Sequence, residues 1–269
     1  METERTRIAD HPVIRFGQGD RSLVIIPGLN DSLQGDKPSR FTRLLLERHY
    51  MRAFVEEFDV YVVSRPRELP EDVTTRDLAA GYATVLAELG EADVVGMSMG
   101  GLIGQYLGIE HSEHVRNLVV ALAGPTLSEQ GQGLVTEWME AGQDGRWEDV
   151  YLGTVESTYS SASKRTVYGA LFKLPGVVNT PPYPNDFIRS AQACLNHDST
   201  DRLERITTPT LVLGGEQDAL FDAEDLREMA AILPNGRPCI IEGTGHGAFE
   251  ERRSEFTTAI TSFLTDSVE

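Results

Sequence analysis

The sequence has no long apolar run and only two cysteines. No stretch approaches the roughly eighteen apolar residues that a membrane-spanning helix needs. The first twelve residues, METERTRIADHP, are charged and lack the apolar segment of a secretory signal. Cys194 and Cys239 are far apart in the chain, so we expect two free thiols in a reducing compartment. Together these absences predict a cytoplasmic protein that has no membrane partner.

Positive charge is also scarce. The chain has 24 basic and 42 acidic residues, a net charge of -18, and its only lysines are Lys37, Lys164 and Lys173. Such a chain repels the phosphate backbone, so we expect no nucleic-acid partner. The acidic excess is compatible with an ordinary acidic cytoplasmic protein. It also fits adaptation to high salt, where screening weakens repulsion among carboxylates, and the shortage of lysine beside abundant arginine favours that interpretation.

Motifs for nucleotides and metals are missing as well. Neither G-x-G-x-x-G after a strand nor G-x-x-x-x-G-K-[ST] occurs. His111 and His114 have a spacing that a metal pair could use, but the sequence offers no further ligands for them. We therefore expect neither a cofactor nor a metal.

Short apolar runs alternate with helical patterns along the chain. Runs without polar alternation, typical of buried strands, occupy residues 22–28, 58–64, 92–98, 116–124, 208–215 and 237–243, and residues 11–20 resemble a strand that ends in a glycine turn. Helical patterns occupy residues 41–57, 75–89, 100–110 and 222–233. Buried strands separated by helices predict an α/β fold with a mostly parallel, doubly wound sheet.

One long segment breaks this rhythm. About eighty residues between Gly124 and Thr208 contain helical patterns and a proline-rich stretch but no convincing strand. Loops of that length without structure are uncommon in compact domains. We therefore predict a core of residues 1–125 and 207–269 with a helical cap inserted over residues 126–206.

The stretch GMSMGG, residues 96–101, follows one of the buried runs. Gly96 and Gly100 lack side chains, which allows a strand to turn sharply into a helix. Ser98 at the apex matches the nucleophile elbow G-x-S-x-G and would lie at a helix N-terminus, where negative charge is favoured. The alternative is a glycine-rich turn with an N-capping serine.

A nucleophilic serine needs a base. His246 is our candidate, because three glycines surround it in a loop directly after the last predicted strand. His197, at the end of the cap, is its rival. We expect the remaining histidines at the surface or far from the carboxyl-end loops; they are His11, His49, His111 and His114.

The imidazole in turn needs a carboxylate that holds its tautomer. Asp218, three residues beyond a buried strand, suits this role, and Glu216 is the second candidate. Asp222 is better explained as the N-cap of the following helix. All the favoured groups lie beyond the carboxyl ends of strands, where open α/β sheets bind ligands.

The order Ser98, Asp218, His246 along the chain resembles that of the α/β-hydrolase superfamily, and the resemblance covers nearly the whole chain. FGQGDRSLVIIPG (16–28) resembles its first hairpin, and HVRNLVVALAGP (114–125) and ERITTPTLVLGGEQD (204–218) resemble the strands that flank its cap. The chain looks most like small cytosolic carboxylesterases and enol-lactone hydrolases with a four-helix lid. A serine elbow argues against the related haloalkane dehalogenases and soluble epoxide hydrolases, which carry aspartate.

Catalysis also requires donors for the oxyanion. The first is expected to be the backbone N–H of Met99, directly after the nucleophile. By resemblance the second comes from the loop after residues 22–28, where Pro27-Gly28-Leu29 replaces the family's usual His-Gly. We expect the N–H of Leu29 there, with Asn30 as the alternative. The missing histidine, whose ring normally makes structural hydrogen bonds, leaves the path of this loop open.

These features predict a cofactor-independent serine hydrolase that cleaves a small ester-type molecule through an acyl-enzyme on Ser98. Alternatives on the same fold are a C–C hydrolase, thioesterase, lactonase or perhydrolase, or a non-enzymatic ligand-binding protein. We expect the substrate to carry a short or medium acyl chain, and the oligomeric state is left open. The cap's candidate pocket residues, which would otherwise pack its helices together, are Trp138, Trp147, Tyr151 and Phe187.

Salt adaptation predicts that added chloride salt stabilises the fold. Raising NaCl or KCl from about 0.1 M to about 1 M shortens the Debye length from roughly 10 to 3 Å, so repulsion among the carboxylates should weaken and the melting temperature should rise. Chloride salts are chosen because sulfate stabilises most proteins by exclusion from their surfaces. A melting temperature and an activity indifferent to molar chloride would contradict the prediction.

Overall fold

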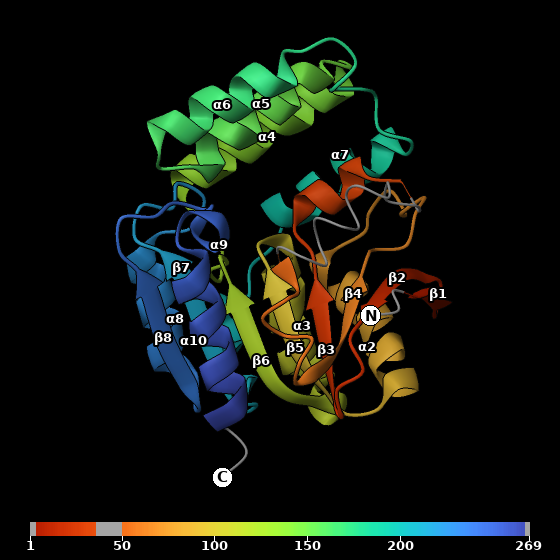
Figure 1. Cartoon of the computed structure of the whole chain (residues 1–269), viewed down its shortest axis with the longest axis vertical. Helices are drawn as coiled ribbons and strands as arrows, with labels where there is room; N and C mark the ends of the chain where they lie inside the picture. Colours follow the sequence, from red (N-terminus) through yellow and green to blue (C-terminus); the bar gives the residue numbers. More distant parts are fainter. Residues whose placement is uncertain (1–3, 36–49, 267–269) are drawn as a thin grey trace.

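A central sheet organises the structure (Figure 1), a computed structural model that describes residues 4–35 and 50–266. Eight strands form the sheet within those residues, in the order β1-β2-β4-β3-β5-β6-β7-β8. β2 is antiparallel to its neighbours β1 and β4, and the other pairings are parallel. The strands are β1 (Glu4–Ile8), β2 (His11–Phe16), β3 (Arg21–Ile26), β4 (Phe58–Val63), β5 (Ala92–Met97), β6 (Val115–Ala121), β7 (Thr210–Gly215) and β8 (Gly236–Ile241).

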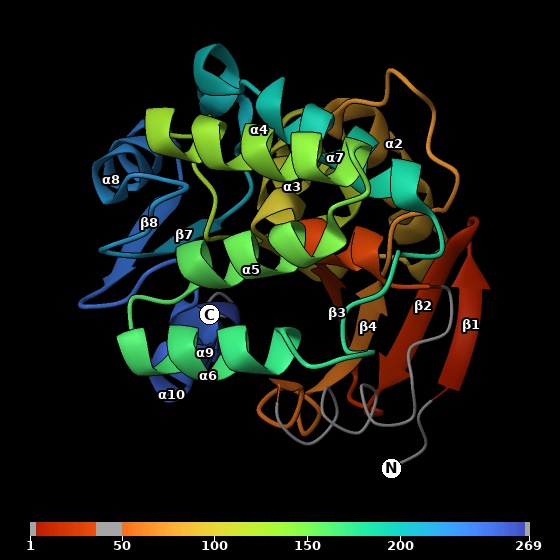
Figure 2. The same ribbon diagram turned by 90° about the horizontal axis from the view of Figure 1, so that it is seen from above.

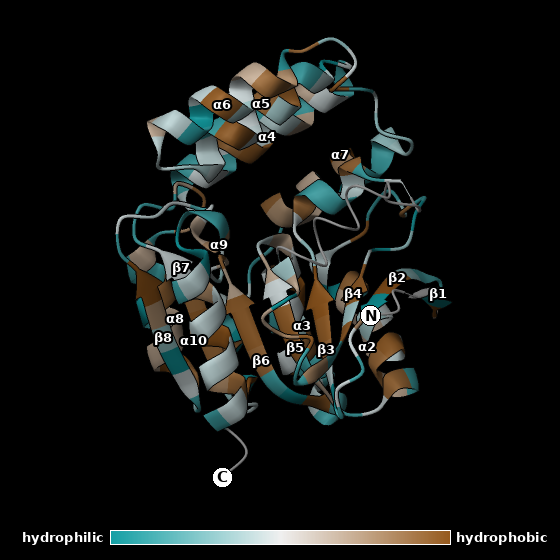
Figure 3. Ribbon diagram, in the orientation of Figure 1, coloured by the Kyte–Doolittle hydropathy of each residue, from teal (hydrophilic) through white to brown (hydrophobic). Residues whose placement is uncertain are grey.

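Helices cover both faces of this sheet, which confirms the predicted doubly wound α/β fold. One face packs against α2 (Thr75–Leu89), α3 (Met99–Glu110) and α8 (Ala223–Ile232), and the other against α10 (Arg253–Asp266), which follows the short α9 (Ala248–Glu251). Successive residues of the central strands enter opposite cores, as Leu23 and Val24 do in β3. Because both faces are covered, the carboxyl-terminal parts of the central strands are apolar, as Figure 3 shows for β3 and β6, whereas Arg21, Arg116 and Asn117 lie near the amino ends of these two strands.

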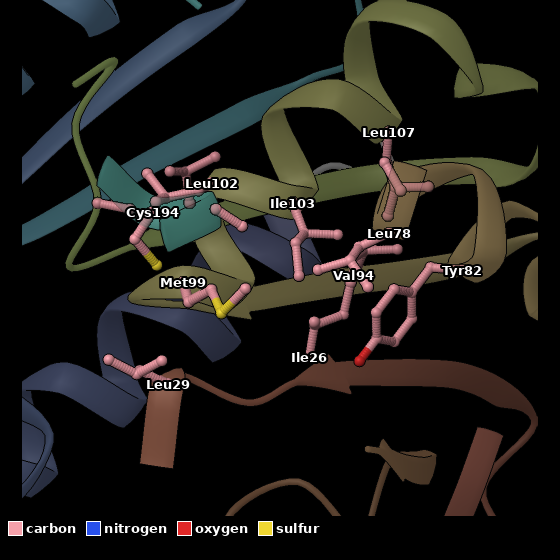
Figure 4. Close-up of a cluster of buried hydrophobic side chains, with 14 of the residues drawn as sticks. Ile26, Leu29, Leu78, Tyr82, Val94, Met99, Leu102, Ile103, Leu107 and Cys194 are labelled. Atoms are coloured by element: carbon pink, nitrogen blue, oxygen red, sulfur yellow. The ribbon is translucent and has the colours of Figure 1, made fainter. Parts of the chain in front are cut away.

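The core on the α2 and α3 side extends to the loops above the sheet. Figure 4 shows Ile26 of β3 and Val94 of β5 beneath Leu102 and Ile103 of α3, with Met99 in the same cluster. Leu29, from the loop after β3, also belongs to it. The residue after Ser98 is therefore anchored in the main hydrophobic core.

Local sequence explains where α2 begins. Thr74 has extended backbone, and its hydroxyl accepts the N–H of Asp77 at 3.1 Å. The carboxylate of Asp77 accepts the N–H of Thr74 at 3.0 Å in return, which completes a capping box. Buried Leu78, Tyr82 and Val85 then recur at helical spacing against the sheet.

Two expectations about the first third of the chain are wrong. β2 and β3 do not form a hairpin, because both edges of β3 are occupied by β4 and β5, and β2 instead pairs with β1 and the outer edge of β4. Of the helix expected over residues 41–57, residues 51–57 are bends and turns that lead into β4. Residues 41–49 of that segment, including His49, lie outside the described residues.

Four α-helices lie between β6 and β7, in the segment predicted as the cap. They are α4 (Glu129–Gln143), α5 (Trp147–Thr158), α6 (Ala162–Phe172) and α7 (Pro184–Leu195), and the 3-10 helix η4 (Thr200–Arg205) returns the chain to the sheet. They extend across the carboxyl ends of the central strands (Figure 2). The division into core and cap domains stays a prediction.

No helix in the described ranges is both long and apolar enough to cross a membrane.

The contact between α3 and β3 leaves no room for a side chain at Gly100. A Cβ there would lie 2.0 Å from the carbonyl oxygen of Ile26. We expect Gly100→Ala to force the helix away from the strand and to lower the free energy of unfolding by roughly 1–3 kcal/mol or more.

Gly133→Ala in α4 is the matched control for urea denaturation. Gly133 is exposed, and nothing lies within 4 Å of a Cβ built there. This substitution should be neutral or stabilise by about 0.5–1 kcal/mol, because alanine favours helix interiors. Equal effects of the two substitutions would contradict the packing argument.

Candidate active site

The structure places Ser98 at a sharp turn between β5 and α3. Its φ of 53° lies in the left-handed region of the backbone, which residues other than glycine seldom occupy. The N–H of Ser98 donates to the carbonyl of Ala121 at 2.8 Å, and its own carbonyl accepts from Gly101 and Leu102 in α3. Such backbone strain costs about 1–3 kcal/mol and concentrates at functional sites. The sharp turn expected from the sequence, with Ser98 at its apex, is present.

Three predicted residues from distant parts of the chain meet at this turn. Nε2 of His246 is 2.9 Å from Oγ of Ser98, and Nδ1 of His246 is 2.8 Å from Oδ2 of Asp218. The other carboxylate oxygen of Asp218 accepts the N–H of Leu220 at 2.8 Å. Asp218 and His246 are buried, with 5% and 8% of their surfaces exposed, so the contact is shielded from solvent.

The hydrogen bonds determine which imidazole nitrogen carries the proton. A carboxylate only accepts, so in the neutral ring Nδ1 donates to Asp218 and Nε2 is left to accept from Ser98. The ring of Phe221 stacks beside His246, with 6.0 Å between centroids. The arrangement can therefore remove a proton from the serine hydroxyl.

The rival candidates lie elsewhere. His197 is buried between α2 and α3, where Nδ1 is 2.8 Å from the hydroxyl of Thr75 and Nε2 is 3.4 Å from the side-chain oxygen of Gln105. Glu216 is exposed and accepts the N–H of Gly243 at 2.9 Å. Asp222 does precede α8, as expected, but its side chain makes no capping hydrogen bond.

The other described histidines are also remote from Ser98. His11 is buried at the start of β2, and its Nδ1 is 3.0 Å from the carbonyl oxygen of Ser64. His111 and His114 are half-buried beside the short 3-10 helix η3 (Ser112–His114). Within the described ranges, no group of three or more His, Cys, Asp or Glu residues is arranged to hold a metal ion.

The two expected oxyanion donors are the first residues of neighbouring helices. Met99 begins α3, and Leu29 begins the 3-10 helix η1 (Leu29–Leu33). First-turn N–H groups have no partner within their own helix, and they carry the positive end of its dipole. The residues before these two helix starts lie close together: a Cβ at Gly28 would lie 3.2 Å from Cβ of Ser98 and 3.6 Å from its Oγ.

An arginine that the sequence analysis did not consider holds the η1 loop. Arg65 follows β4, has no exposed surface, and donates to the carbonyls of Pro27, Gly28 and Leu29. Asp31 of η1 lies beside it and pairs with Arg67 at 3.1 Å. A charged residue directly beyond a buried strand at the carboxyl edge is the sequence signal that could have identified it.

A cavity of about 600 Å³ opens above Ser98 and His246. Gly28, Leu29, Asn30 and Met99 line it on the sheet side, so both candidate second donors adjoin it. The rest of its wall is mostly apolar and includes, from the cap segment and the loops around it, Leu127, Val135, Val155, Phe172, Leu220 and Phe221.

The four aromatic residues proposed for the pocket separate into two pairs. Trp138 and Tyr151 line the cavity. Trp147 and Phe187 are not among its described lining residues; they are 6% and 0% exposed, and their rings meet edge to face with centroids 5.9 Å apart. This second pair packs the cap helices α5 and α7 against each other. Cys194, the buried one of two free cysteines, also adjoins the cavity, and burial raises the pKa of its thiol to about 12.

Hydrogen bonds join the cap segment to the loop that carries His246. The N–H of Gly247 donates to the carbonyl of Thr158 at 2.5 Å, and the hydroxyl of Tyr159 donates to Glu250 at 2.8 Å. Glu251 accepts the N–H of Ser161 at 2.9 Å as well as a bond from the hydroxyl of Ser160. The end of α5 and the residues after His246 are thus bound to one another.

The family model described as alpha/beta hydrolase fold matches residues 22–253, which include nearly all of β3, the turn at Ser98, the cap segment and the loop of His246. This chain belongs to the alpha/beta hydrolase fold family. The resemblance drawn from the order of Ser98, Asp218 and His246 is thereby confirmed at the level of family and fold.

Similar proteins within the alpha/beta hydrolase fold family include several hydrolases. The chain is 26% identical over 179 residues to the pimeloyl-(acyl-carrier protein) methyl ester esterase of Vibrio cholerae, which covers 64% of this chain and 69% of that protein. The enol-lactonase from Burkholderia xenovorans superimposes with a TM-score of 0.78 at 16% identity, covering 97% of this chain and 100% of the other. An esterase from Exiguobacterium antarcticum gives a TM-score of 0.71 at 20% identity, covering 98% and 100%. The two structures bear on the fold alone.

The buried position of His197 predicts that acid destabilises this alpha/beta hydrolase. Burial lowers the pKa of His197 from 6.5 to about 4, so between these values the unfolded chain binds a proton that the folded chain does not. The contribution of the neutral His197 imidazole to the free energy of unfolding is complete above pH 6.5. It is lost as the pH falls towards 4, a change on the order of 3 kcal/mol. Urea denaturation at a series of pH values should show less acid sensitivity for His197→Asn than for the natural chain.

His114→Asn, at the half-buried end of η3, is the control for that comparison. It removes a histidine without disturbing the buried contacts with Thr75 and Gln105. An identical dependence of unfolding free energy on pH in the natural chain and in His197→Asn would rule out the assignment.

Proposed function

We propose that this chain is a cofactor-independent serine hydrolase that cleaves a small ester-type substrate through an acyl-enzyme on Ser98. The observation that carries the proposal is the continuous hydrogen-bonded series from Asp218 through His246 to Ser98, with 2.8 and 2.9 Å between the bonded atoms. Isolated serine hydroxyls are poor nucleophiles, and an adjacent oriented base is the usual means of activating them.

In the first half of the proposed reaction, Oγ of Ser98 attacks the ester carbonyl as Nε2 of His246 takes its proton. The carboxylate of Asp218 stabilises the resulting imidazolium. The carbonyl oxygen becomes an oxyanion that accepts from the N–H groups of Met99 and Leu29. When the tetrahedral species collapses, the bond to the leaving oxygen breaks and the imidazolium returns the proton to the alcohol.

Water completes the cycle. Nε2 of His246 takes a proton from a water molecule, which attacks the acyl carbonyl bound to Ser98. Collapse of the second tetrahedral species breaks the bond to Oγ, and the proton passes from His246 back to the serine. The carboxylic acid leaves, and the side chains of Ser98 and His246 regain their original protonation states.

The cavity favours an acyl group without charge. Its lining is mostly apolar, and Trp138 and Tyr151 supply aromatic surface from the cap segment. A volume of about 600 Å³ lies in the range of pockets for small molecules. We propose esters of short or medium acyl chains as substrates, to be ranked by a chain-length series of esters and matching thioesters.

Substitution of the nucleophile tests the proposal. Ser98→Ala should lower kcat for p-nitrophenyl butyrate by about 10⁶-fold if the three residues act as a unit. Glu216→Gln, which alters the other candidate acid, should leave kcat unchanged because Glu216 bonds to Gly243 and not to the imidazole.

Near-natural turnover by Ser98→Ala would overturn the mechanism. Labelling of Ser98 by a fluorophosphonate without turnover of any ester or thioester in the series would indicate a binding protein with a reactive serine instead of an enzyme.

A further inference from the structure

The carbonyl groups of three consecutive residues converge on one buried side chain. Nη1 of Arg65 donates to the oxygen of Pro27 at 3.0 Å, and Nη2 donates to the oxygens of Gly28 at 2.9 Å and Leu29 at 3.3 Å. Nη2 also donates to the hydroxyl of Ser32 at 3.0 Å. With none of its surface exposed, Arg65 makes these bonds to the loop and not to solvent.

These carbonyls belong to the same peptide units as the candidate oxyanion donors. The carbonyl of Gly28 and the N–H of Leu29 share one planar unit, and the carbonyl of Leu29 shares the next with the N–H of Asn30. The described backbone has no cis peptide bond, so C=O and N–H point in opposite directions in each unit. A guanidinium that holds the oxygens on one side therefore turns the N–H groups towards the other.

The Ser98 turn lies against the same loop. A Cβ built on Gly28 would lie 3.2 Å from Cβ of Ser98, which makes the two residues close neighbours, and Leu29 and Asn30 line the cavity with Ser98. We propose that Arg65 is a positioning residue that orients the Gly28–Leu29 peptide so that its N–H faces the oxyanion formed at Ser98. This inference rests on the proposed function.

The surroundings of Arg65 explain how a buried charge is retained there. The backbone N–H of Arg65 donates to Oδ2 of Asp31 at 3.1 Å, and its Nη2 is 3.7 Å from the same oxygen. Burial by itself raises the pKa of the Asp31 carboxyl, but Arg65 and Arg67 outweigh this effect and hold the pKa below 3.8. Asp31 lies on η1, so the ion pair ties the loop to the arginine from a second direction.

The cap segment secures the same loop. The hydroxyl of Ser32 in η1 is 2.9 Å from the hydroxyl of Ser190 in α7. Asp186, at the start of α7, accepts the N–H groups of Glu68 and Leu69 at 2.9 Å, directly after Arg65 and Arg67. α7 therefore bonds both to the loop that Arg65 orients and to the segment that follows Arg65.

The experiment compares Arg65→Met with Arg65→Lys on p-nitrophenyl butyrate, with rates normalised to active sites titrated by a fluorophosphonate. Loss of one oxyanion donor typically lowers kcat by about 10²–10³-fold, so we expect a loss of at least about 10-fold for Arg65→Met with KM within about threefold. Arg65→Lys should recover part of kcat, since an ammonium group can still donate to one of the carbonyls.

Arg21→Met is the matched control. Arg21 begins β3, at the end of that strand remote from Ser98, and donates to the buried Asp93 at 2.7 Å and to the carbonyl of Leu264 at 3.0 Å. Its loss removes an ion pair of a similar kind, so it should lower the melting temperature but leave kcat unchanged. If Arg65→Met does not fold, Arg65→Lys alone is compared with this control and should lose kcat with KM retained.

A boronic acid inhibitor supplies a readout that general destabilisation would not move. Its tetrahedral adduct on Ser98 places an oxygen where the oxyanion forms, so its affinity should fall in Arg65→Met in proportion to kcat/KM. Unchanged kcat in both Arg65 variants, or an equal loss in Arg21→Met, would overturn the inference. If Ser98→Ala were as active as the natural chain, the proposed function itself would fail, which is a different result.

Discussion

The close approach of α3 to the carboxyl end of β3 is the constraint on which the site depends. A single residue, Ser98, separates the end of β5 from the start of α3, and the first turn of α3 lies against the backbone of Ile26 because Gly100 has no side chain. The first N–H groups of α3 and η1 are thereby brought to the same edge of the sheet. The strained backbone of Ser98 follows from the abrupt change of direction.

Features encoded in short stretches could be predicted from the sequence. The buried strands, α2, the turn at Ser98 and the loops of Asp218 and His246 each carry a local pattern, and parallel strands place their carboxyl ends together. β1 escaped prediction because Ala9 and Asp10, which have positive φ in its hairpin, are not the usual Asn-Gly pair. α6 carries only a weak local pattern, because it buries no residue and so has no apolar stripe that faces a core.

Long-range pairings were beyond the sequence. The choice of β4 rather than β2 as the neighbour of β3 depends on packing across the whole sheet, and no local pattern encodes it. Arg65 is distant in the chain from the carbonyls that it binds, and arginine is usually exposed. The family's usual histidine is absent from the loop after β3, and here the side chain of Arg65, two residues beyond the neighbouring strand β4, bonds the loop.

The bonds between the end of α5 and the residues after His246 have a consequence for substrate access. Thr158 and Tyr159 are held by Gly247 and Glu250, which lie within four residues of the imidazole. A tilt of α5 away from the sheet would either break these hydrogen bonds or carry the loop of His246 with it. A movement of this end of the cap segment is therefore coupled to the position of the His246 imidazole relative to Ser98.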